Sequence, residues 1–161
     1  MVRAILIFKL IILLFCFTFS FSLQAQSITG KAKIIDGDTI HIGKNKIRLH
    51  GIDAPEWNQP CTINNKVWEC GKKSTLALKK LIDNQTVVCE IKDIDRYKRY
   101  IAVCFSNKIN LNKEMVHNGW AIAYRYYSKD YIEEEEVAQK NKVGIWKGKF
   151  LEPYLFRKKN K

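Results

Sequence analysis

Three strand-like segments lie close together near the start of the chain, and they constrain the fold more than any other feature. They read SITGKAKIID (27–36), DTIHIG (38–43) and KIRLHGI (46–52). The first two are separated by Asp36-Gly37, and the last two by Gly43-Lys44-Asn45. Such turns favour hairpins, because glycine accepts the positive φ that a tight turn needs. We therefore expect three consecutive strands joined by hairpin turns.

The third segment indicates which side of these strands is buried. Ile47 and Leu49 point one way, whereas Lys46, Arg48 and His50 point the other way. This is the period-two pattern of a strand with one buried face. Arg48 is therefore expected on the polar face.

Two more strands and three helices are expected further along the chain. GKKSTLALKKLID (71–83) reads as a helix with one apolar side, and TVVCEIKDI (86–94) and IAVCF (101–105) read as strands. NLNKEMVHNG predicts a short helix between an Asn110 cap and Gly119, and SKDYIEEEEVAQKNKVG predicts a longer helix capped by Ser128. Five short strands with a helix after the third predict an α+β domain, a five-stranded OB-type β-barrel with three helices.

The first 25 residues have the pattern of an export signal. MVRAILIFK (1–9) carries two positive charges, LIILLFCFTFSFSL (10–23) carries none, and Leu23-Gln24-Ala25 suits a signal-peptidase cut. The apolar run is short for a membrane span, which needs about 20 residues; an uncleaved anchor is the alternative. We expect a signal peptide at 1–25, one domain at 26–150 and a mobile basic tail at 151–161. The protein would be exported, either secreted or periplasmic, without stable membrane association.

The charge of the chain favours polyanionic partners. The chain has 28 basic and 16 acidic residues, and removal of residues 1–25 would leave a net charge of +10. Nucleic acid, anionic lipid and acidic polysaccharide all fit such a charge. A soluble surface with surplus lysine is the alternative.

Four cysteines follow the signal, an even number that suggests two disulfides in an exported chain. Cys61 and Cys70 flank the polar loop CTINNKVWEC, whereas Cys89 and Cys104 sit in the two later strands. Three connectivities are possible, and pairing within each set is the simplest. A four-cysteine zinc site is the rival, but no CxxC spacing supports it.

Three segments carry the charged residues on which a catalytic site could depend. They are IDGDT (35–39), RLHGIDAPE (48–56) and DRYKRYIA (95–102), and together they supply Asp38, Arg48, Asp53, Glu56 and Arg99. Taken singly, each has an ordinary explanation as a turn, a loop start or a structural ion pair. Their occurrence together makes a catalytic site the better interpretation.

These five side chains match what hydrolysis of a phosphodiester requires. Asp38 and Asp53 are suitable oxygen ligands for a hard divalent cation, which offsets negative charge on the phosphate. Arg48 and Arg99 can bind phosphate oxygens by charge-assisted hydrogen bonds. Glu56 can take a proton from the attacking water, and Pro55 restricts the loop that holds it.

The order of motifs resembles the staphylococcal nuclease (thermonuclease) family. IDGDT, RLHGIDAPE and DRYKRYIA are followed by MVHNGWAIAYRYY (115–127) and EEEEVAQKNKVGIW (133–146), so the resemblance spans roughly residues 30–147. It implies a secreted, Ca²⁺-dependent nuclease without sugar specificity that hydrolyses DNA and RNA to leave 3′-phosphates. The expected form is a monomer.

The resemblance also implies a role for each site residue. Ca²⁺ would be bound by Asp38, Asp53 and the carbonyl of Ala54. Arg48 and Arg99 would bind the scissile phosphate and stabilise the transition state, and Glu56 would be the general base or orient the water. The nucleotide would contact Arg96, Tyr97, Tyr124 and Tyr126; plain packing is the alternative for these tyrosines, and Tyr127 ranks behind the other two.

Two departures from the family pattern stand out. Lys98 occupies a position where the family usually has glycine, and if that position needs positive φ, lysine costs about 1 kcal/mol of backbone strain. The loop after Glu56 carries Cys61 and Cys70 in place of a lysine-rich loop.

Two other functions are alternatives to the nuclease. One is a catalytically inactive nucleic-acid-binding module of the same fold, which would be expected to lack one or more of the five charged residues; all five are present. The other is a binder of anionic lipid or wall polymer, which rests on charge alone and explains none of the motifs.

Overall fold

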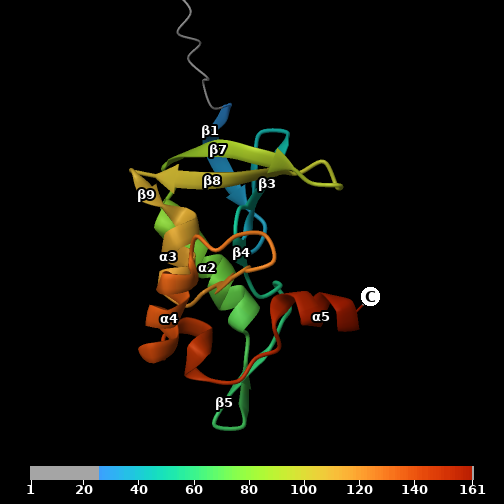
Figure 1. Cartoon of the computed structure of the whole chain (residues 1–161), viewed down its shortest axis with the longest axis vertical. Coiled ribbons are helices and arrows are strands. Elements are labelled where there is room, and N and C mark those ends of the chain that lie inside the picture. Colours follow the sequence, from blue (N-terminus) through green and yellow to red (C-terminus); the bar gives the residue numbers. More distant parts are fainter. Residues whose placement is uncertain (1–25, 161) are drawn as a thin grey trace, which may run out of the picture.

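The structure is a computed structural model that describes residues 26–160 (Figure 1). The expected signal peptide, residues 1–25, lies outside the described residues. Among the residues that are described, no helix combines the length and the apolar character that crossing a membrane requires.

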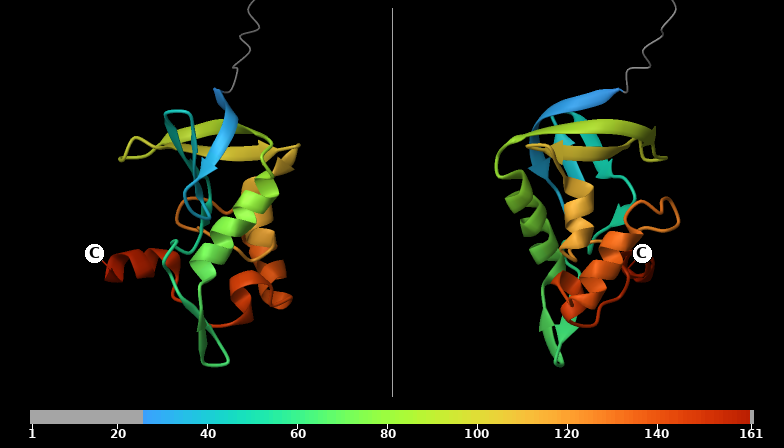
Figure 2. Two further views of the ribbon diagram at one scale, coloured as in Figure 1. Left: turned by 180° about the vertical axis from the view of Figure 1, so that it is seen from behind. Right: turned by 60° about the vertical axis from the view of Figure 1, so that its left-hand side comes forward.

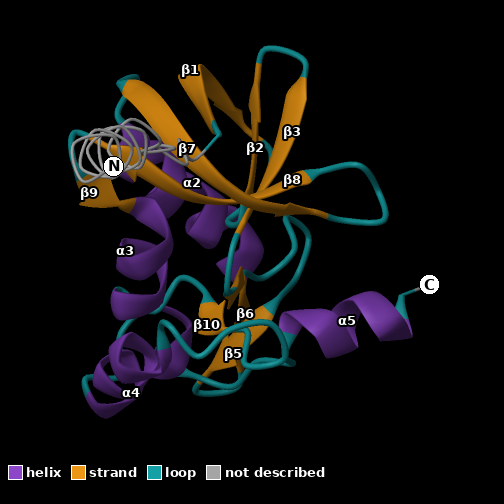
Figure 3. Ribbon diagram, turned by 45° about the horizontal axis from the view of Figure 1, so that its top comes forward, coloured by secondary structure: helices purple, strands orange, loops and turns teal. Residues whose placement is uncertain are grey.

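Five strands form a closed barrel, as the sequence predicts. They are β1 (Ser27–Ile34), β2 (Thr39–Ile42), β3 (Asn45–Leu49), β7 (Thr86–Ile94) and β8 (Tyr100–Ser106). The sheet order is β3-β2-β1-β7-β8, and a parallel pairing of β3 with β8 closes it (Figure 3). Ile47 pairs with Tyr100 and Arg48 pairs with Ile101 in that closure, so Arg99, in the turn just before β8, lies near the start of the strand that neighbours β3.

The barrel is filled by the apolar faces of these strands. Ile47 and Leu49 are buried, as their alternation in β3 predicts, and Ile40 and Val87 join them from β2 and β7. Burial of one such side chain contributes about 1.5–3 kcal/mol. The polar face of β3 is thereby left to carry Arg48 out of the core.

Three helices lie below the barrel; the first two pack against it, and the third packs on the second (Figures 1 and 2). α2 (Cys70–Ile82) buries Leu78 and Ile82, and α3 (Leu111–His117) buries Met115. The side chain of Asn110 accepts a hydrogen bond from the backbone N–H of Lys113, which confirms the predicted N-cap of α3. The third helix is α4 (Ile132–Lys140).

The predicted start of the longer helix was wrong by three residues, because Tyr131 rather than Ser128 stands at the N-cap position. Ser128 does not cap α4, because its Oγ accepts a hydrogen bond from the backbone N–H of Asp130, 3.0 Å away, and closes a local turn instead. The helix then begins at Ile132 with Glu133, Glu134 and Glu135 in its first turn. Acidic side chains there favour the helix through its dipole.

A fourth helix, α5 (Pro153–Lys159), replaces the expected mobile tail. Proline is well suited to the first turn of a helix, because its missing N–H has no partner there in any case. Seven residues are too few for a stable isolated helix. α5 therefore depends on tertiary contacts that the sequence of the tail does not show.

The loop after Glu56 is also more regular than expected. It contains a small hairpin of β5 (Cys61–Ile63) and β6 (Lys66–Trp68), turned by Asn64 and Asn65 with positive φ. The remaining short elements are β4 (Ile52–Asp53), β9 (Ile109–Asn110), β10 (Ile122–Ala123) and the 3₁₀ helix η1 (Gly144–Lys147).

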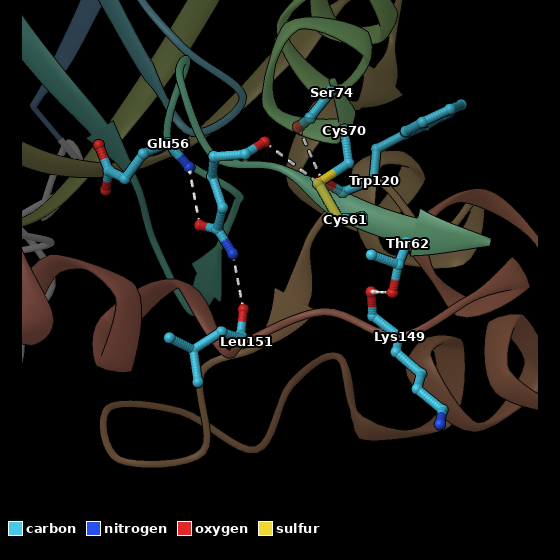
Figure 4. Close-up of a disulfide and its surroundings, with 9 residues drawn as sticks. Glu56, Cys61, Thr62, Cys70, Ser74, Trp120, Lys149 and Leu151 are labelled. Atoms are coloured by element: carbon cyan, nitrogen blue, oxygen red, sulfur yellow. Dashed lines mark hydrogen bonds between the residues drawn. A yellow bond between two sulfur atoms is a disulfide. The ribbon is translucent and has the colours of Figure 1, made fainter. Parts of the chain in front are cut away.

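Both disulfides follow the simplest pairing. Cys61 is bonded to Cys70, which ties the small hairpin to the start of α2 (Figure 4). Cys89 is bonded to Cys104, its direct partner across β7 and β8. A zinc site of these four cysteines is thereby ruled out.

Reduction of these bridges should lower stability. The Cys89–Cys104 bridge has a sequence separation of 15, and closing a loop of that size contributes about 3 kcal/mol in the chain-entropy model. We expect the free energy of unfolding of residues 26–161, measured with urea, to fall by about that amount or more in dithiothreitol. A variant with alanine at all four cysteines should show no response to the reductant. An unchanged wild-type midpoint would contradict the prediction.

Candidate active site

The fold brings Asp38, Arg48 and Asp53 together from three consecutive segments. Thr39 pairs with Arg48 between β2 and β3, which places Asp38 beside the end of β3. The backbone N–H of Leu49 donates to the carbonyl of Asp38 at 2.8 Å. Asp53 follows in β4. Backbone pairing between strands therefore fixes the positions of all three residues.

The Arg48 guanidinium bridges the two aspartates. Its Nη2 lies 2.6 Å from Asp53 Oδ1 and 3.1 Å from Asp38 Oδ2. Asp38 also accepts hydrogen bonds from the Thr39 hydroxyl and from the backbone N–H of Ala54. Asp53 is fully buried and Asp38 is 2% exposed, so their charges depend on these partners.

Burial and neighbouring charges shift the pKa values of the ionisable groups in this cluster. Burial raises the pKa of Asp36 to about 7, and the nearby charge of Asp38 adds to the effect. Burial, followed by the charge of Asp38, also raises the pKa of Asp53. Burial alone would lower the pKa of Arg48, but the charges of Asp38 and Asp53 raise it instead. Buried carboxylates of this kind are suited to a cationic partner.

Gly37 is needed here for a reason that differs from the one expected. It is not among the glycines with positive φ. A Cβ at this position would lie 2.0 Å from Ser74 Oγ and 2.7 Å from Ala54 Cβ. Glycine therefore allows the Asp36–Asp38 segment to lie directly against α2 and the Ala54 loop.

The loop that carries Glu56 is held at both ends by buried contacts. The Gln59 side chain accepts a hydrogen bond from the Glu56 N–H at 3.2 Å and donates to the Leu151 carbonyl at 2.6 Å (Figure 4). The N–H of Gly71, at the start of α2, donates to the Gln59 carbonyl at 3.1 Å. Glu56 itself is half-buried, so its carboxylate is positioned but accessible.

A groove of about 1130 Å³ runs past this cluster. The β7–β8 turn and α5 project on the same side of the barrel and flank it (Figures 1 and 3). Its lining is rich in cationic and aromatic side chains, among them Lys46, Arg48, Lys92, Arg96, Tyr97, Arg99, Tyr124, Tyr127, Tyr154, Arg157 and Lys158. Such a groove suits a polyanion with stacked rings.

Arg99 reaches the groove from the turn between β7 and β8. Its Nε and Nη2 each lie 2.7 Å from Asp95 Oδ2, and its backbone N–H donates to Asp95 Oδ1. Burial opposes ionisation of Asp95, but the hydrogen bonds from Arg99 outweigh it and lower the pKa of Asp95. The Tyr97 ring lies under the guanidinium groups of Arg96 and Arg99, with centroid distances of 4.9 and 5.6 Å.

Tyr127, rather than Tyr126, joins Tyr124 in the groove. The backbone N–H groups of Tyr127 and Ser128 both donate to the Tyr124 carbonyl, and this turn directs Tyr126 outward. Tyr126 is 82% exposed and does not line the groove. Tyr124 is held in place by pairing of its segment with β4, where its N–H donates to the Gly51 carbonyl at 2.9 Å.

Sequence reasoning missed one residue at the centre of the site, Arg157 of α5. Its Nη1 lies 2.9 Å from Asp53 Oδ1 and 2.8 Å from Glu56 Oε1, and its Nη2 lies 3.1 Å from Asp53 Oδ2. These carboxylates raise the pKa of Arg157, although burial alone would lower it. About one hundred residues separate Arg157 from its partners, and no local pattern in the basic tail indicated the contact.

Comparison with known proteins gives the family. The model of the family described as "Staphylococcal nuclease homologue" matches residues 46–148, which contain most of the site. The chain belongs to the staphylococcal nuclease family. This confirms the resemblance predicted from the motifs.

Three curated relatives illustrate the range of this family. The chain is 38% identical over 137 residues to an "Uncharacterized endonuclease" of Haemophilus influenzae, covering 80% of this chain and 72% of the relative. It is 32% identical to a "Micrococcal nuclease" of Shigella flexneri, covering 80% and 79%. It is 33% identical to "Succinoglycan biosynthesis protein ExoI" of Rhizobium meliloti, covering 76% of this chain and 66% of that protein.

The donor chemistry of the site fits the calcium ion that the family implies. Asp38 and Asp53 offer carboxylate oxygens, which hard divalent cations prefer, and they lie close enough to share one guanidinium. Between residues 26 and 160, no cluster of three or more His, Cys, Asp or Glu side chains is arranged to hold a metal. The remaining ligands would have to be backbone oxygen, as expected for Ala54, and water.

Lys98 has a backbone conformation that glycine adopts more easily, as the usual glycine of the family at this position suggested. Its φ is +61°, in the left-handed region that disfavours side chains. We expect Lys98→Gly to raise the free energy of unfolding by up to about 1 kcal/mol, measured with urea, since the strain exceeds the added entropy of the unfolded chain. Lys98→Ala, which keeps the Cβ, should give no such gain. A loss of stability in Lys98→Gly would show that the lysine side chain makes a compensating contact.

Proposed function

We propose that this member of the nuclease family is an exported, Ca²⁺-dependent enzyme that hydrolyses phosphodiester bonds in both DNA and RNA. It leaves 3′-phosphate ends and acts as a monomer. The observation that carries the proposal is the convergence of Asp38, Arg48, Asp53 and Glu56 beside a groove lined by cations and tyrosines. Two disulfides and the pattern of residues 1–25 support export.

The groove would bind the substrate through its backbone. Cationic side chains on both sides attract phosphates, and the exposed Tyr97 ring offers a face for stacking. Neither contact reads a base edge or a sugar hydroxyl, so little preference between DNA and RNA follows. Arg96, Tyr97 and Tyr124 are the proposed nucleotide contacts; Tyr127 fits the groove better than Tyr126.

Each charged residue has a distinct part in the proposed reaction. Arg48 and Arg99 hold the non-bridging oxygens of the scissile phosphate, and their hydrogen bonds strengthen as charge develops there. Glu56 takes a proton from a water molecule while the water oxygen forms a bond to phosphorus. The bond from phosphorus to the 5′-oxygen breaks, that oxygen takes a proton from solvent water and leaves as a hydroxyl, and the phosphate stays on the 3′-oxygen. Calcium, held by Asp38, Asp53 and the Ala54 carbonyl, would supply further charge stabilisation.

A metal-dependent cleavage assay tests the function directly. Residues 26–161 with oxidised cysteines would be incubated at low salt with single-stranded DNA, in Ca²⁺, in Mg²⁺ or in a chelator. We expect cleavage in Ca²⁺ alone, with 3′-phosphate ends, and a loss of turnover by orders of magnitude in Glu56→Gln. Binding without cleavage under every metal would overturn the proposal in favour of an inactive nucleic-acid-binding module.

The two arginines can be tested in the same assay. We expect Arg48→Ala and Arg99→Ala each to reduce turnover about a hundredfold or more, the usual loss when one donor to the transition state is removed. Lys80→Ala removes the same charge from the exposed side of α2, which does not line the groove, and should leave turnover unchanged. Thermal melting would verify that each variant is folded. Full activity in either arginine variant would remove that residue from the mechanism.

A further inference from the structure

Arg157 holds the same carboxylates that the proposed reaction uses. Its three hydrogen bonds go to both oxygens of Asp53, a proposed calcium ligand, and to one oxygen of Glu56, the proposed base. Asp53 Oδ1 also accepts from Arg48. Each carboxylate oxygen has only about two lone pairs. A cation that binds Asp53 must therefore share or take oxygens that Arg157 occupies.

The rest of α5 is only lightly attached to the domain. Pro153 is its one buried residue, and the side chains of Tyr154 and Leu155 are 47% and 42% exposed. The helix projects away from the barrel and the other helices (Figures 1 and 2). Segments with few buried contacts open at low cost. Beside the packing of Pro153 and the half-buried Phe156, the hydrogen bonds and ion pairs of Arg157 tie α5 to the site.

The segment before α5 is anchored firmly and can act as a pivot. Lys149 and Thr62 exchange two backbone hydrogen bonds, of 2.8 and 2.9 Å. The Leu151 carbonyl accepts from Gln59, which also binds the Glu56 N–H (Figure 4). The chain is thus fixed up to Leu151, close to the loop of Glu56. Only the helix beyond it needs to move for Arg157 to leave the carboxylates.

We propose that α5 is a latch on the active site, and that Arg157 and a divalent cation compete for Asp53 and Glu56. The inference rests on the proposed Ca²⁺ site. In the latched state the guanidinium is hydrogen-bonded to both carboxylates and occupies the position next to them. Cation binding releases Arg157 and frees Glu56 to accept a proton. The affinity of the protein for Ca²⁺ is then reduced by the fraction of molecules that are latched.

Calorimetric titration of Ca²⁺ into residues 26–161, without nucleic acid, tests the latch. If about one molecule in ten is unlatched, Arg157→Gln should bind Ca²⁺ about tenfold more tightly than the wild type. Lys159→Ala is the matched control, because it removes one positive charge from the same helix at an exposed position outside the groove. Its affinity should stay near that of the wild type, which separates release of the latch from a general change in charge.

Hydrogen exchange gives a second, independent measurement. The amides of Phe156 and Asn160 donate within α5 and should exchange slowly in the latched protein. We expect saturating Ca²⁺ to speed their exchange in the wild type, and Arg157→Gln to show fast exchange with or without Ca²⁺. Amides of the barrel strands should not respond.

Two outcomes would overturn the latch. Equal or weaker Ca²⁺ binding by Arg157→Gln, including no binding by either protein, would show that Arg157 does not compete with the cation. Protection of α5 that is unchanged by bound Ca²⁺ would do the same. These readouts do not depend on hydrolysis. A latch that responds to Ca²⁺ in a protein without activity would refute the proposed function alone, whereas an active enzyme whose Arg157→Gln variant binds no tighter would refute the latch alone.

Discussion

The site depends on the sharing of one guanidinium between two buried carboxylates. Asp38 and Asp53 lie out of solvent, 3.1 and 2.6 Å from Nη2 of Arg48. Burial of two like charges is costly unless each has a partner. Burial, followed by the charge of Asp38, raises the pKa of Asp53 even with these partners in place. Buried carboxylates of this kind are suited to a cationic partner, which Arg157 supplies in this structure and a metal ion would supply in the proposed reaction.

The barrel supplies the rigidity that this cluster needs. The register of β2 with β3 sets Asp38 beside Arg48, and the pairing of β4 with β10 sets Asp53 beside the tyrosine segment. The parallel closure of β3 on β8 then brings Arg99 to the same groove. Backbone pairing in a closed sheet leaves little freedom to any of these positions. Glu56, by contrast, sits on a loop that Gln59 and the start of α2 hold in place.

The C-terminal helix α5 contributes Arg157 to the site from outside the region that matches the family. That region ends at residue 148, whereas α5 starts at Pro153. Arg157 nevertheless makes as many hydrogen bonds to the site carboxylates as any other residue among 26–160. A short and largely exposed helix that ion pairs tie to the site is well placed to respond to a change in the charge of the site.

Local patterns in the sequence determined much of this protein. The alternation in 46–50, the glycine turns and the helix after the third strand were sufficient to predict the barrel, and the motif order was sufficient to predict the family; the roles of the five charged residues stay a prediction. These features are local, or are repeated in a fixed order. The tertiary structure alone decided what depends on distant contacts. It turned Tyr126 away from the groove and Tyr127 into it, moved the start of α4 from Ser128, made Gly37 a point of close packing and folded the tail into α5. No pattern within FRKKNK reveals that Arg157 meets Asp53 and Glu56, because the attraction between these charges acts through space and leaves no periodic trace in the chain.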